Sequence, residues 1–533
     1  MSDAAALPDR GAPSQSSPPP APRPAPGAAR LVVSNRPLLI GGAMAAMIMQ
    51  VLDTTIANVA LPHMQASLGA TTDTITWVLT SYVLASAIAL PATGWLVNRL
   101  GLRTVFVFSV AAFTFASVLC GLAQNMPQIV GFRVLQGLAG AFLAPLAQTV
   151  LLDASSEEER PRMMIIYSQG VLLGPIIGPV LGGYITENFS WHWVFLINLP
   201  VGIITGLVLF TMLPNLQGAR QQFDFRGWAL LGVAVAALQL MLDRGQGEDW
   251  FSSAEIVIYA VMALAAFWMA GVHLFMKKDS IFPRELFTDM NLVLCVFFTF
   301  IFGTVTMSVM ALLPGLLQQI YGYPAIDAGW LLIPRGLGML LSMTFIGSLI
   351  AKLDARLALA IGLGISGGSM WMMTGWTIDM PATDIFLAGL VQGVGFSFLF
   401  MPLNILAFAT LPGHLRTHAT SLLNLIRNIG QSIGLAVCTV LLSRNIQVNH
   451  AELGARITQY SFPVDVERLS STGQISQGAL SVVNGIVTKQ AAMISYLNDF
   501  WFMAIICWAA IPLIVFTRKP KPAAAPPSGD IPH

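Results

Sequence analysis

The chain has 533 residues, of which 55% are hydrophobic and only 10% charged, and its formal net charge is +1. Soluble domains carry roughly 25% charged residues, and a water-soluble protein could not hide this much apolar surface. The small net charge gives no reason to expect a polyanionic partner such as a nucleic acid. We therefore expect an all-α polytopic membrane protein.

Residues 1–35 are rich in Pro, Ala and Ser and are expected to form a disordered cytoplasmic tail. The first span would then act as its own uncleaved signal. Apolar runs of about 20 residues, enough to cross a bilayer, follow along the chain. The fourteen runs lie near 38–60, 76–97, 104–123, 127–149, 164–186, 193–213, 227–243, 255–275, 291–313, 328–350, 357–378, 384–408, 419–442 and 498–517.

Lysine and arginine are distributed unevenly over the predicted connections. With the N-terminus inside, nineteen of them fall on the inner side and five on the outer side. Because cytoplasmic connections carry the excess of Lys and Arg, both termini are expected to be cytoplasmic.

One acid and one base stand out by their depth. Of the 26 acids, Asp53 is the one expected well inside a span, roughly 10 Å from the outer end at 1.5 Å per residue. Arg133 lies at nearly the same depth in the fourth span. An unpaired buried charge is expensive, so we expect the two to pair, by default for function. The alternative is a purely structural ion pair.

Two pairs of segments repeat with an offset of eight spans. The turns after spans two and ten read GWLVNRLGLR (94–103) and GSLIAKLDAR (347–356), and spans four and twelve share Gln-Gly and Phe-Leu at 136–145 and 392–402. Parallel repeats of this kind mark one large transporter fold. The expected domains are an N-terminal six-helix bundle (36–213), two linker transmembrane helices (214–290), a C-terminal six-helix bundle (291–517) with a long periplasmic loop (443–497), and a cytoplasmic tail (518–533).

The fifth span reads GVLLGPIIGPVLGG from Gly170 to Gly183. Glycines four residues apart form one smooth stripe, which lets two helix backbones approach closely in a membrane. Prolines after two of these glycines remove backbone donors and bend the helix. The residues concerned are Gly170, Gly174, Pro175, Gly178, Pro179 and Gly182. Packing alone is the alternative.

Two further arginines, Arg335 and Arg427, fall inside spans, and the sequence offers no second acid deep in a span to pair with them. They either snorkel or bond helix carbonyls, or they favour neutral and weakly acidic amphiphiles as ligands. Methionine and aromatic side chains adapt to many ligand shapes, although each is by itself more consistent with ordinary packing. The candidate cavity residues besides the two arginines are Met47, Gln50, Phe142, Met310, Phe396 and Met401, with Met44, Met307, Trp371 and Phe400 beside them.

Several motifs resemble those of the fourteen-span EmrB/QacA-type drug:proton antiporters of the major facilitator superfamily. They are LDTTIANVALP (52–62), the turn at 94–103, FRVLQGLAG (132–140), the fifth span, WHWVFLINLPVG (191–202) and NLIRNIGQSIG (424–434). The resemblance implies the major facilitator fold, with two six-helix bundles and two extra central helices, and makes Asp53 the proton-carrying acid with Arg133 beside it. It also assigns conformational roles to Gly94, Arg99, Gly101, Arg103, Gly137 and the fifth span. Asn98 and His192 depart from the pattern, which usually has Asp and Arg there.

The resemblance further implies proton-coupled multidrug efflux across a bacterial inner membrane by alternating access. A periplasmic adaptor and an outer-membrane channel are possible partners, with the loop 443–497 as the contact. No phosphate loop, metal-ligand cluster or nucleophile triad indicates an enzyme, and the proton gradient is the only cofactor expected. The alternatives are a dedicated exporter of one metabolite or fatty-acid class and a transport-dead sensor or scaffold.

Overall fold

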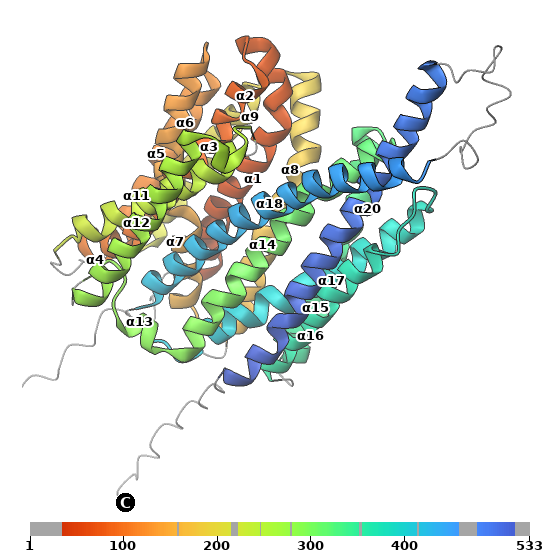
Figure 1. Cartoon of the computed structure of the whole chain (residues 1–533). Coiled ribbons are helices and arrows are strands. Elements are labelled where there is room, and N and C mark those ends of the chain that lie inside the picture. Colours follow the sequence, from red (N-terminus) through yellow and green to blue (C-terminus); the bar gives the residue numbers. More distant parts are fainter. Residues whose placement is uncertain are drawn as a thin grey trace, which may run out of the picture.

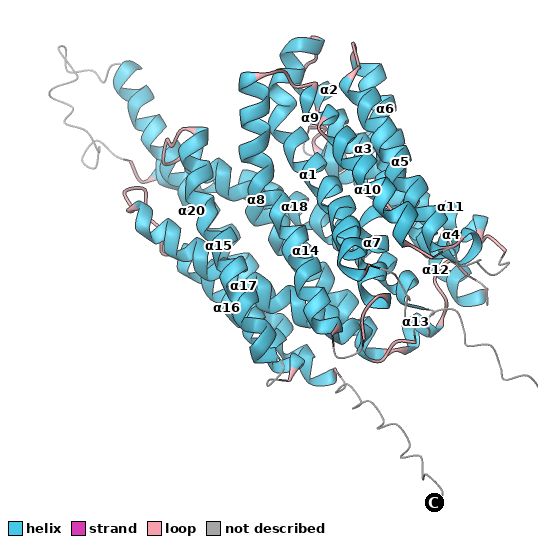
Figure 2. Cartoon of the chain, turned by 180° about the vertical axis from the view of Figure 1, so that it is seen from behind, coloured by secondary structure: helices cyan, strands magenta, loops and turns pink. Residues whose placement is uncertain are grey.

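The computed structural model describes residues 35–156, 159–214, 222–245, 247–277, 280–350, 354–412, 415–457 and 477–517. Within these residues every regular element is a helix, as Figure 2 shows. The two predicted tails, apart from Asn35, lie outside the described residues.

Each predicted span coincides with one helix or with a few consecutive ones. The first six spans become α1 (Arg36–Leu68), α2 (Thr72–Ile75), α3 (Trp77–Ala89), η1 (Leu90–Ala92), α4 (Thr93–Leu100), α5 (Leu102–Gly121), α6 (Met126–Gly140), α7 (Leu143–Asp153), α8 (Arg160–Asn188), α9 (Trp193–Leu196) and α10 (Asn198–Met212). The two linker spans become α11 (Phe225–Gly245), η2 (Trp250–Ser252) and α12 (Ala254–Met276), followed by the short α13 (Glu285–Thr288). The last six become α14 (Met290–Gln319), α15 (Ala325–Ile350), α16 (Ala355–Met373), α17 (Ala382–Ala409), α18 (Arg416–Ala455), α20 (Gln477–Ala510) and η4 (Ile511–Phe516).

Eleven helical stretches in the described part of the chain are long and apolar enough to cross a membrane. They account for all predicted spans except α8, α15 and α16, which are 29, 26 and 19 residues long. A membrane crossing needs about 20 residues, so these three have suitable lengths. The polytopic architecture is confirmed, and the total of fourteen spans stays a prediction for these three helices.

The helices form two bundles. Figure 1 shows the helices of the first half on one side and α14 to α20 on the other. In the first bundle α1 packs on α8 and α10, and α6 on α3 and α5; in the second α14 packs on α18, and α17 on α15 and α16. The bundles meet where α8 contacts α15 and α17, and where α18 contacts α4 and α7.

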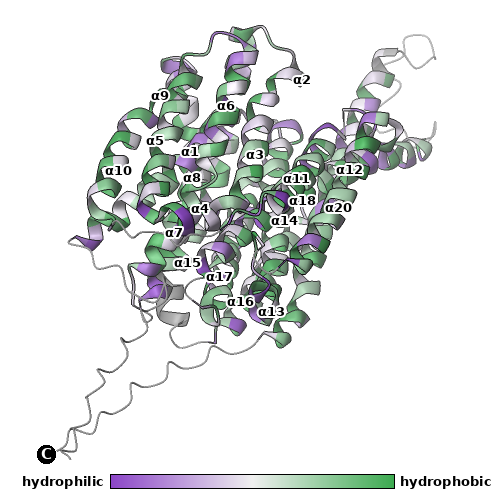
Figure 3. Ribbon diagram, turned by 90° about the vertical axis from the view of Figure 1, so that its left-hand side faces the viewer, coloured by the Kyte–Doolittle hydropathy of each residue, from purple (hydrophilic) through white to green (hydrophobic). Residues whose placement is uncertain are grey.

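The two linker helices are central in the chain but peripheral in space. They pack on each other, and α11 also contacts α3 and α18. Only 22% of the 18-residue apolar segment of α12 is buried, the smallest share among the eleven stretches. Figure 3 shows hydrophobic residues along α11 and α12. Such a surface suits contact with lipid.

Local sequence explains where several helices begin and end. Asn35 and Asn125 cap α1 and α6, because each side-chain oxygen accepts a hydrogen bond from a backbone N–H in the first turn. Asp289 caps α14 in the same way. Gly101 separates α4 from α5 with a φ of 86°, a left-handed conformation that favours glycine. The turn expected at 94–103 is therefore a break at Gly101 between two helices, since residues 94–100 belong to α4.

The repeat is also visible in side-chain contacts. In the first bundle Thr55 Oγ1 on α1 donates to the carbonyl of Gly174 on α8, at 3.2 Å. In the second bundle Thr304 Oγ1 on α14 donates to the carbonyl of Gly430 on α18, at 3.0 Å. In both bundles, therefore, a threonine hydroxyl on the first helix donates a hydrogen bond to a glycine carbonyl on the fifth helix.

The long connection expected at 443–497 is largely helical where the structure describes it. α18 is 40 residues long and continues to Ala455, and α20 is 34 residues long and begins at Gln477. The two helices stay paired beyond the predicted spans, because Asn449 Nδ2 donates to Ser495 Oγ at 3.0 Å. Residues 458–476 lie outside the described part.

Candidate functional site

Asp53 lies in a buried polar cluster in the first bundle. Arg133 Nη1 donates to its Oδ2 at 2.6 Å, and both side chains are at most 1% exposed. Gln136 Nε2 and Asn198 Nδ2 donate to its Oδ1, at 2.9 and 2.8 Å. The carboxylate therefore accepts three hydrogen bonds, one of them from a cation, which compensates its charge in a low-dielectric interior.

Four helices position this cluster. Asp53 comes from α1, Arg133 and Gln136 from α6, and Asn198 from the first residue of α10. Ser117 on α5 completes it, because its Oγ accepts from Asn198 Nδ2 at 2.9 Å and donates to the Phe195 carbonyl at 2.9 Å. The orientation of Asn198 is thus fixed by a second hydrogen bond, and the carboxylate is held from several sides.

Aromatic rings cover the guanidinium of Arg133. Its Cζ lies 4.6 Å from the ring centroid of Phe195 and 5.3 Å from that of Tyr82. Arg133 Nη1 also donates to Gln136 Oε1 at 2.9 Å. A cation over aromatic faces is stabilised without needing water. The predicted Asp53–Arg133 pair is present, while its role in proton coupling stays a prediction.

Sequence reasoning missed the two amides. Gln136 lies three residues after Arg133 on α6, and this spacing places both side chains on one helix face. The spacing could therefore have predicted that Gln136 lies beside the ion pair. Asn198 is a polar residue in an apolar stretch. Its reach to Asp53 depends on how α10 packs on α1, which no local pattern encodes.

The glycine stripe of α8 packs against α1. A Cβ at Gly174 would overlap Val51 Cγ1, and one at Gly178 would overlap Thr55 Oγ1. A Cβ at Gly182 would come within 3.2 Å of Ile56 Cγ2, and one at Gly170 would overlap the methyl groups of Met44 and Met47. The close approach expected from the sequence is present. The side chains of Pro175 and Pro179 lie outside the described residues.

The turn at 94–103 touches the second bundle through His418 on α18. Asn98 Nδ2 lies 3.2 Å from His418 Nε2, and His418 Nδ1 lies 3.0 Å from the Ile281 carbonyl. A Cβ at Gly94 would overlap the ring of His418. Asn98, one of the two departures from the family pattern, therefore has a histidine partner. Arg99 is exposed, and Arg103 lies over the ring of Phe210, 4.4 Å from its centroid.

Two further polar contacts join the bundles. Gln148 Nε2 on α7 donates to Asn404 Oδ1 on α17 at 2.9 Å, with both side chains buried. Arg416 Nη1 on α18 lies 3.3 Å from Asp153 Oδ1 at the end of α7. Gly137, by contrast, works within the first bundle, since a Cβ there would overlap the Tyr82 carbonyl on α3.

The candidate cavity residues are distributed over both bundles. Met47 and Met401 are fully buried and Phe396 is 1% exposed, while Gln50, Phe142, Met310, Arg335 and Arg427 are partly exposed. Phe396 and Phe400 both pack on Phe302, with ring centroids 5.8 and 5.1 Å away. Arg427 Nη2 donates to Asn424 Oδ1 at 2.5 Å. Their role in binding a substrate stays a prediction.

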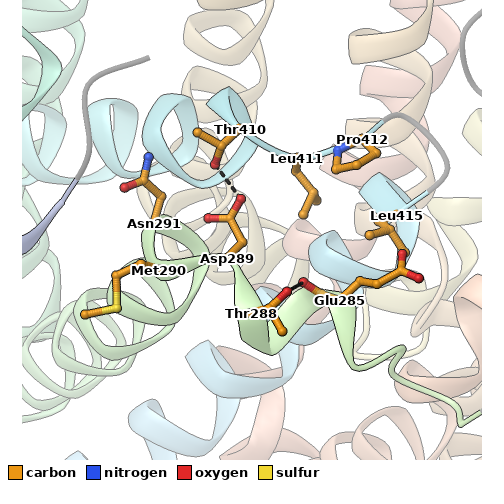
Figure 4. A pocket seen from close by; sticks show the side chains of 9 residues that line it. All are labelled: Glu285, Thr288, Asp289, Met290, Asn291, Thr410, Leu411, Pro412 and Leu415. Carbon is orange, nitrogen blue, oxygen red and sulfur yellow. Dashed lines mark hydrogen bonds between the residues drawn. The ribbon is translucent and has the colours of Figure 1, made fainter. Parts of the chain in front are cut away.

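A pocket of about 330 Å³ lies elsewhere, where α13 and α14 face the end of α17. Figure 4 shows the hydrogen bond that Thr410 Oγ1 donates to Asp289 Oδ2, which is 2.5 Å long. It is lined by Glu285, Thr288, Asp289, Met290, Asn291, Thr410, Leu411, Pro412 and Leu415. None of the candidate cavity residues is among them, so this pocket does not support the predicted substrate site.

That Asp53 is the one acid well inside a span stays a prediction, but the structure adds a second buried carboxylate. Asp499 on α20 is completely buried, inside a stretch apolar enough to span, and neither carboxylate oxygen has a hydrogen-bond partner among the described residues. The apolar run placed the last span at 498–517, so Asp499 fell at its edge, whereas α20 begins at Gln477. The preference for neutral or weakly acidic ligands stays a prediction.

Two titratable groups outside the spans have displaced pKa values. Burial lowers the pKa of His192, whose ring stacks on Trp191 with centroids 3.7 Å apart. Burial acts to raise the pKa of Asp224, but hydrogen bonds from Lys277, His273 and the Gly227 amide hold it below its usual value. Asp224 thereby ties the start of α11 to the end of α12.

Comparisons with known proteins agree with this geometry. The family described as Major Facilitator Superfamily matches residues 43–435. The chain is 34% identical over 487 residues to the multidrug export protein EmrB of Escherichia coli (strain K12), covering 89% of this chain and 93% of that protein. It is 33% identical over 479 residues to the fatty acid resistance protein FarB of Neisseria gonorrhoeae, covering 89% and 94%. The fold is similar to that of the human organic anion transporter MFSD10 (TETRAN), with a TM-score of 0.54, 12% identity and coverage of 89% and 99%.

Proposed function

Because the chain belongs to the major facilitator superfamily, we propose that it exports amphiphilic compounds across a bacterial inner membrane in exchange for protons. Multidrug efflux, the function expected from the sequence, is borne out by the similarity to a multidrug export protein over nearly the whole chain. Proton coupling, the direction of the termini and the partners are our own inferences.

The observation that carries proton coupling is the Asp53 cluster. A carboxylate buried among helices and held by three donors can take up a proton only if at least one of these bonds weakens. Protonation therefore changes the contacts between α1, α6 and α10, while deprotonation restores the pair with Arg133. A residue whose charge state alters the packing of three helices is suited to couple proton movement to a conformational change.

Alternating access requires the bundles to part on one side and then on the other. The contacts Asn98–His418, Gln148–Asn404 and Asp153–Arg416 join them near turns expected on the cytoplasmic side. In this arrangement the inner side is held closed. Opening toward the cytoplasm would break these contacts, while the glycine contact between α1 and α8 keeps the first bundle together.

The orientation and partners follow from the sequence. Nineteen inner against five outer Lys and Arg residues support cytoplasmic termini. The extended ends of α18 and α20 would then project into the periplasm, where an adaptor protein leading to an outer-membrane channel can bind.

A dedicated exporter of one compound class is the second candidate. The similarity to FarB, a fatty acid resistance protein, is nearly as high as that to EmrB. Transport assays with chemically diverse neutral, acidic and cationic amphiphiles distinguish the two, because a dedicated exporter would move only one class.

Replacing Asp53 with Asn tests the proposal. The amide keeps the shape and an acceptor oxygen but cannot cycle a proton, so substrate export driven by an imposed pH gradient in proteoliposomes should disappear. Thermal unfolding in detergent checks that the variant is folded. Asp384→Asn, which removes an exposed acid in the first turn of α17, is the matched control and should transport normally. Proton-driven export at the wild-type rate in the Asp53→Asn protein would refute the proposal.

A further inference from the structure

The second bundle contains a buried carboxylate that the proposed function does not use. Asp499 lies on α20, which packs on α14, α16 and α18. The side chain has no exposed surface, and both oxygens are without a hydrogen-bond partner among the described residues. A charged carboxylate in such a place costs several kcal/mol or more, so it must either carry a proton or meet a cation.

Among the residues that the structure describes, no Lys, Arg or His hydrogen-bonds to Asp499. The titratable groups close enough to be affected by its charge are Cys438 on α18 and Tyr496 on α20, both buried and both uncharged at neutral pH. From α14, Ser308 reaches Cys438. On the side of α16, Trp376 packs on Phe500, the residue next to Asp499, with ring centroids 5.9 Å apart.

Side chains that neighbour Asp499 are buried with it. Phe500 and Cys438 have no exposed surface, and neither has Met503 one turn farther along α20. The pocket described above lies at the other end of the bundle, near α13. An organic cation would need a cavity, whereas a proton binds to the oxygen itself.

Two separate polar contacts lie between Asp499 and the outer end of α20. Ser495 lies one turn before Asp499 on the same face of the helix, and it accepts a hydrogen bond from Asn449 on α18. Farther out, His450 Nε2 lies 2.9 Å from Asn484 Oδ1 at the exposed surface. Asp499 lies about 26 Å from Phe516 at 1.5 Å per residue, which in a core about 30 Å thick places it near the outer boundary.

We propose that Asp499 is a second proton-binding site, which holds a proton in the conformation described here and releases it when the bundles rearrange. The bound proton forms an O–H bond on the carboxyl group and leaves the charge on α20 neutral. Release returns the proton to water and requires that the rearrangement bring water or a donor to the carboxylate. This inference rests on the proposed proton coupling and extends it to more than one proton per cycle.

Proton counting on the full-length protein in detergent tests this proposal. The number of protons released between about pH 5 and about pH 9, the range in which buried carboxylates titrate, should fall by one per chain in Asp499→Asn. Asp499→Glu should restore it. Asp499→Leu removes the carboxyl group without burying an unsatisfied amide, so it gives the same answer if the Asn variant folds poorly. Asp384→Asn controls for the loss of an acid as such.

Transport in proteoliposomes supplies the second measurement. The ratio of protons to substrate should be lower in Asp499→Asn than in the wild type, while the imposed pH gradient still drives some export. An unchanged proton count and ratio would overturn the proposal. So would the selective loss of cationic substrates at an unchanged proton count, since Asp499 would then bind the substrate. Export in the Asp53→Asn protein reports on the proposed function separately, because that result does not depend on Asp499.

Discussion

The two bundles treat a buried carboxylate in opposite ways. In the first bundle Asp53 accepts three hydrogen bonds, one of them from Arg133. In the second bundle Asp499 has none among the described residues. Arg335 on α15 has an Nη1 without a partner, as Arg133 has an Nε and an Nη2 without one, but Arg133 uses its Nη1 to bind Asp53. The first bundle has therefore joined its acid and base, whereas the second holds an acid and a base that are not bonded to each other.

This difference lies in the polar side chains and not in the scaffold. Thr55 over Gly174 and Thr304 over Gly430 show that the same helix pair is joined by the same contact in both halves. A repeat of backbone packing thus carries two different electrostatic arrangements. The comparison teaches that the fold fixes where helices cross, while single substitutions decide which buried group holds its charge.

The largest effect is expected from removing the paired arginine. Arg133→Met leaves Asp53 without its cation, and breaking a buried pair from one side costs about 3–5 kcal/mol. Arg335→Met removes an arginine whose Nη1 has no partner and should cost much less. Thermal unfolding of both variants beside the wild type measures the difference. Equal losses would mean that pairing does not distinguish the two bundles.

The next effect concerns the contact that both halves share. Gly178→Leu would drive a side chain into Thr55, and overpacking of this kind costs about 1–3 kcal/mol. Export should fall or the membrane should leak protons. Gly183→Leu is the control on the same helix, because a Cβ at Gly183 meets nothing within 4 Å. Normal transport without leakage in Gly178→Leu would contradict the close-contact interpretation.

A third carboxylate, Asp224, shows what pairing contributes when the acid does not lie in the membrane. Asp224 lies outside the spans and is paired with Lys277 and with His273 near the end of α12, and these partners hold its pKa below the usual 3.8. Because the pKa of Asp224 is lowered in the folded state, the ionised carboxylate stabilises the fold at pH values above 3.8. This stabilisation is lost as the pH falls through the lowered pKa. Asp224→Asn should lower the stability at neutral pH by about 0.5–1.5 kcal/mol, the net contribution of a typical hydrogen bond. Unfolding measured against pH should show the wild type and the variant converging below about pH 4.

The smallest effect belongs to a pair that water reaches. Arg36 donates to Glu159 at 3.0 Å, and hydrogen bonds from Arg36 and Ser156 lower the pKa of Glu159 from 4.5 to about 2. Any stabilisation is present above pH 4.5 and disappears as the pH falls toward 2. Glu159→Gln should change the melting temperature little, and less at high salt because exposed pairs are screened. A large loss of stability in this variant would show that exposure is not what weakens such pairs.

The sequence predicts those parts of the site that depend on position along one helix. The depths of Asp53 and Arg133 follow from the rise per residue, and the glycine stripe of α8 follows from its four-residue spacing. Asn198 and the His418 partner of Asn98 could not be predicted, because each contact depends on the rotation of one helix against another. The burial of Asp499 could not be predicted, because the end of a span is the least certain part of a hydropathy pattern. Such a pattern also does not show which residues neighbouring helices bury.

The hydrogen bond between Gln148 and Asn404 bears on how fast the transporter can turn over. Both partners are neutral amides, and such a bond contributes only about 0.5–1.5 kcal/mol net, which changes an opening rate by roughly tenfold at most. A buried ion pair at the same place would hold the bundles together for far longer in every cycle. Domain opening limits the rate of many proteins that work by conformational change. A weak hydrogen bond between the bundles therefore shortens the time that each transport cycle spends before opening.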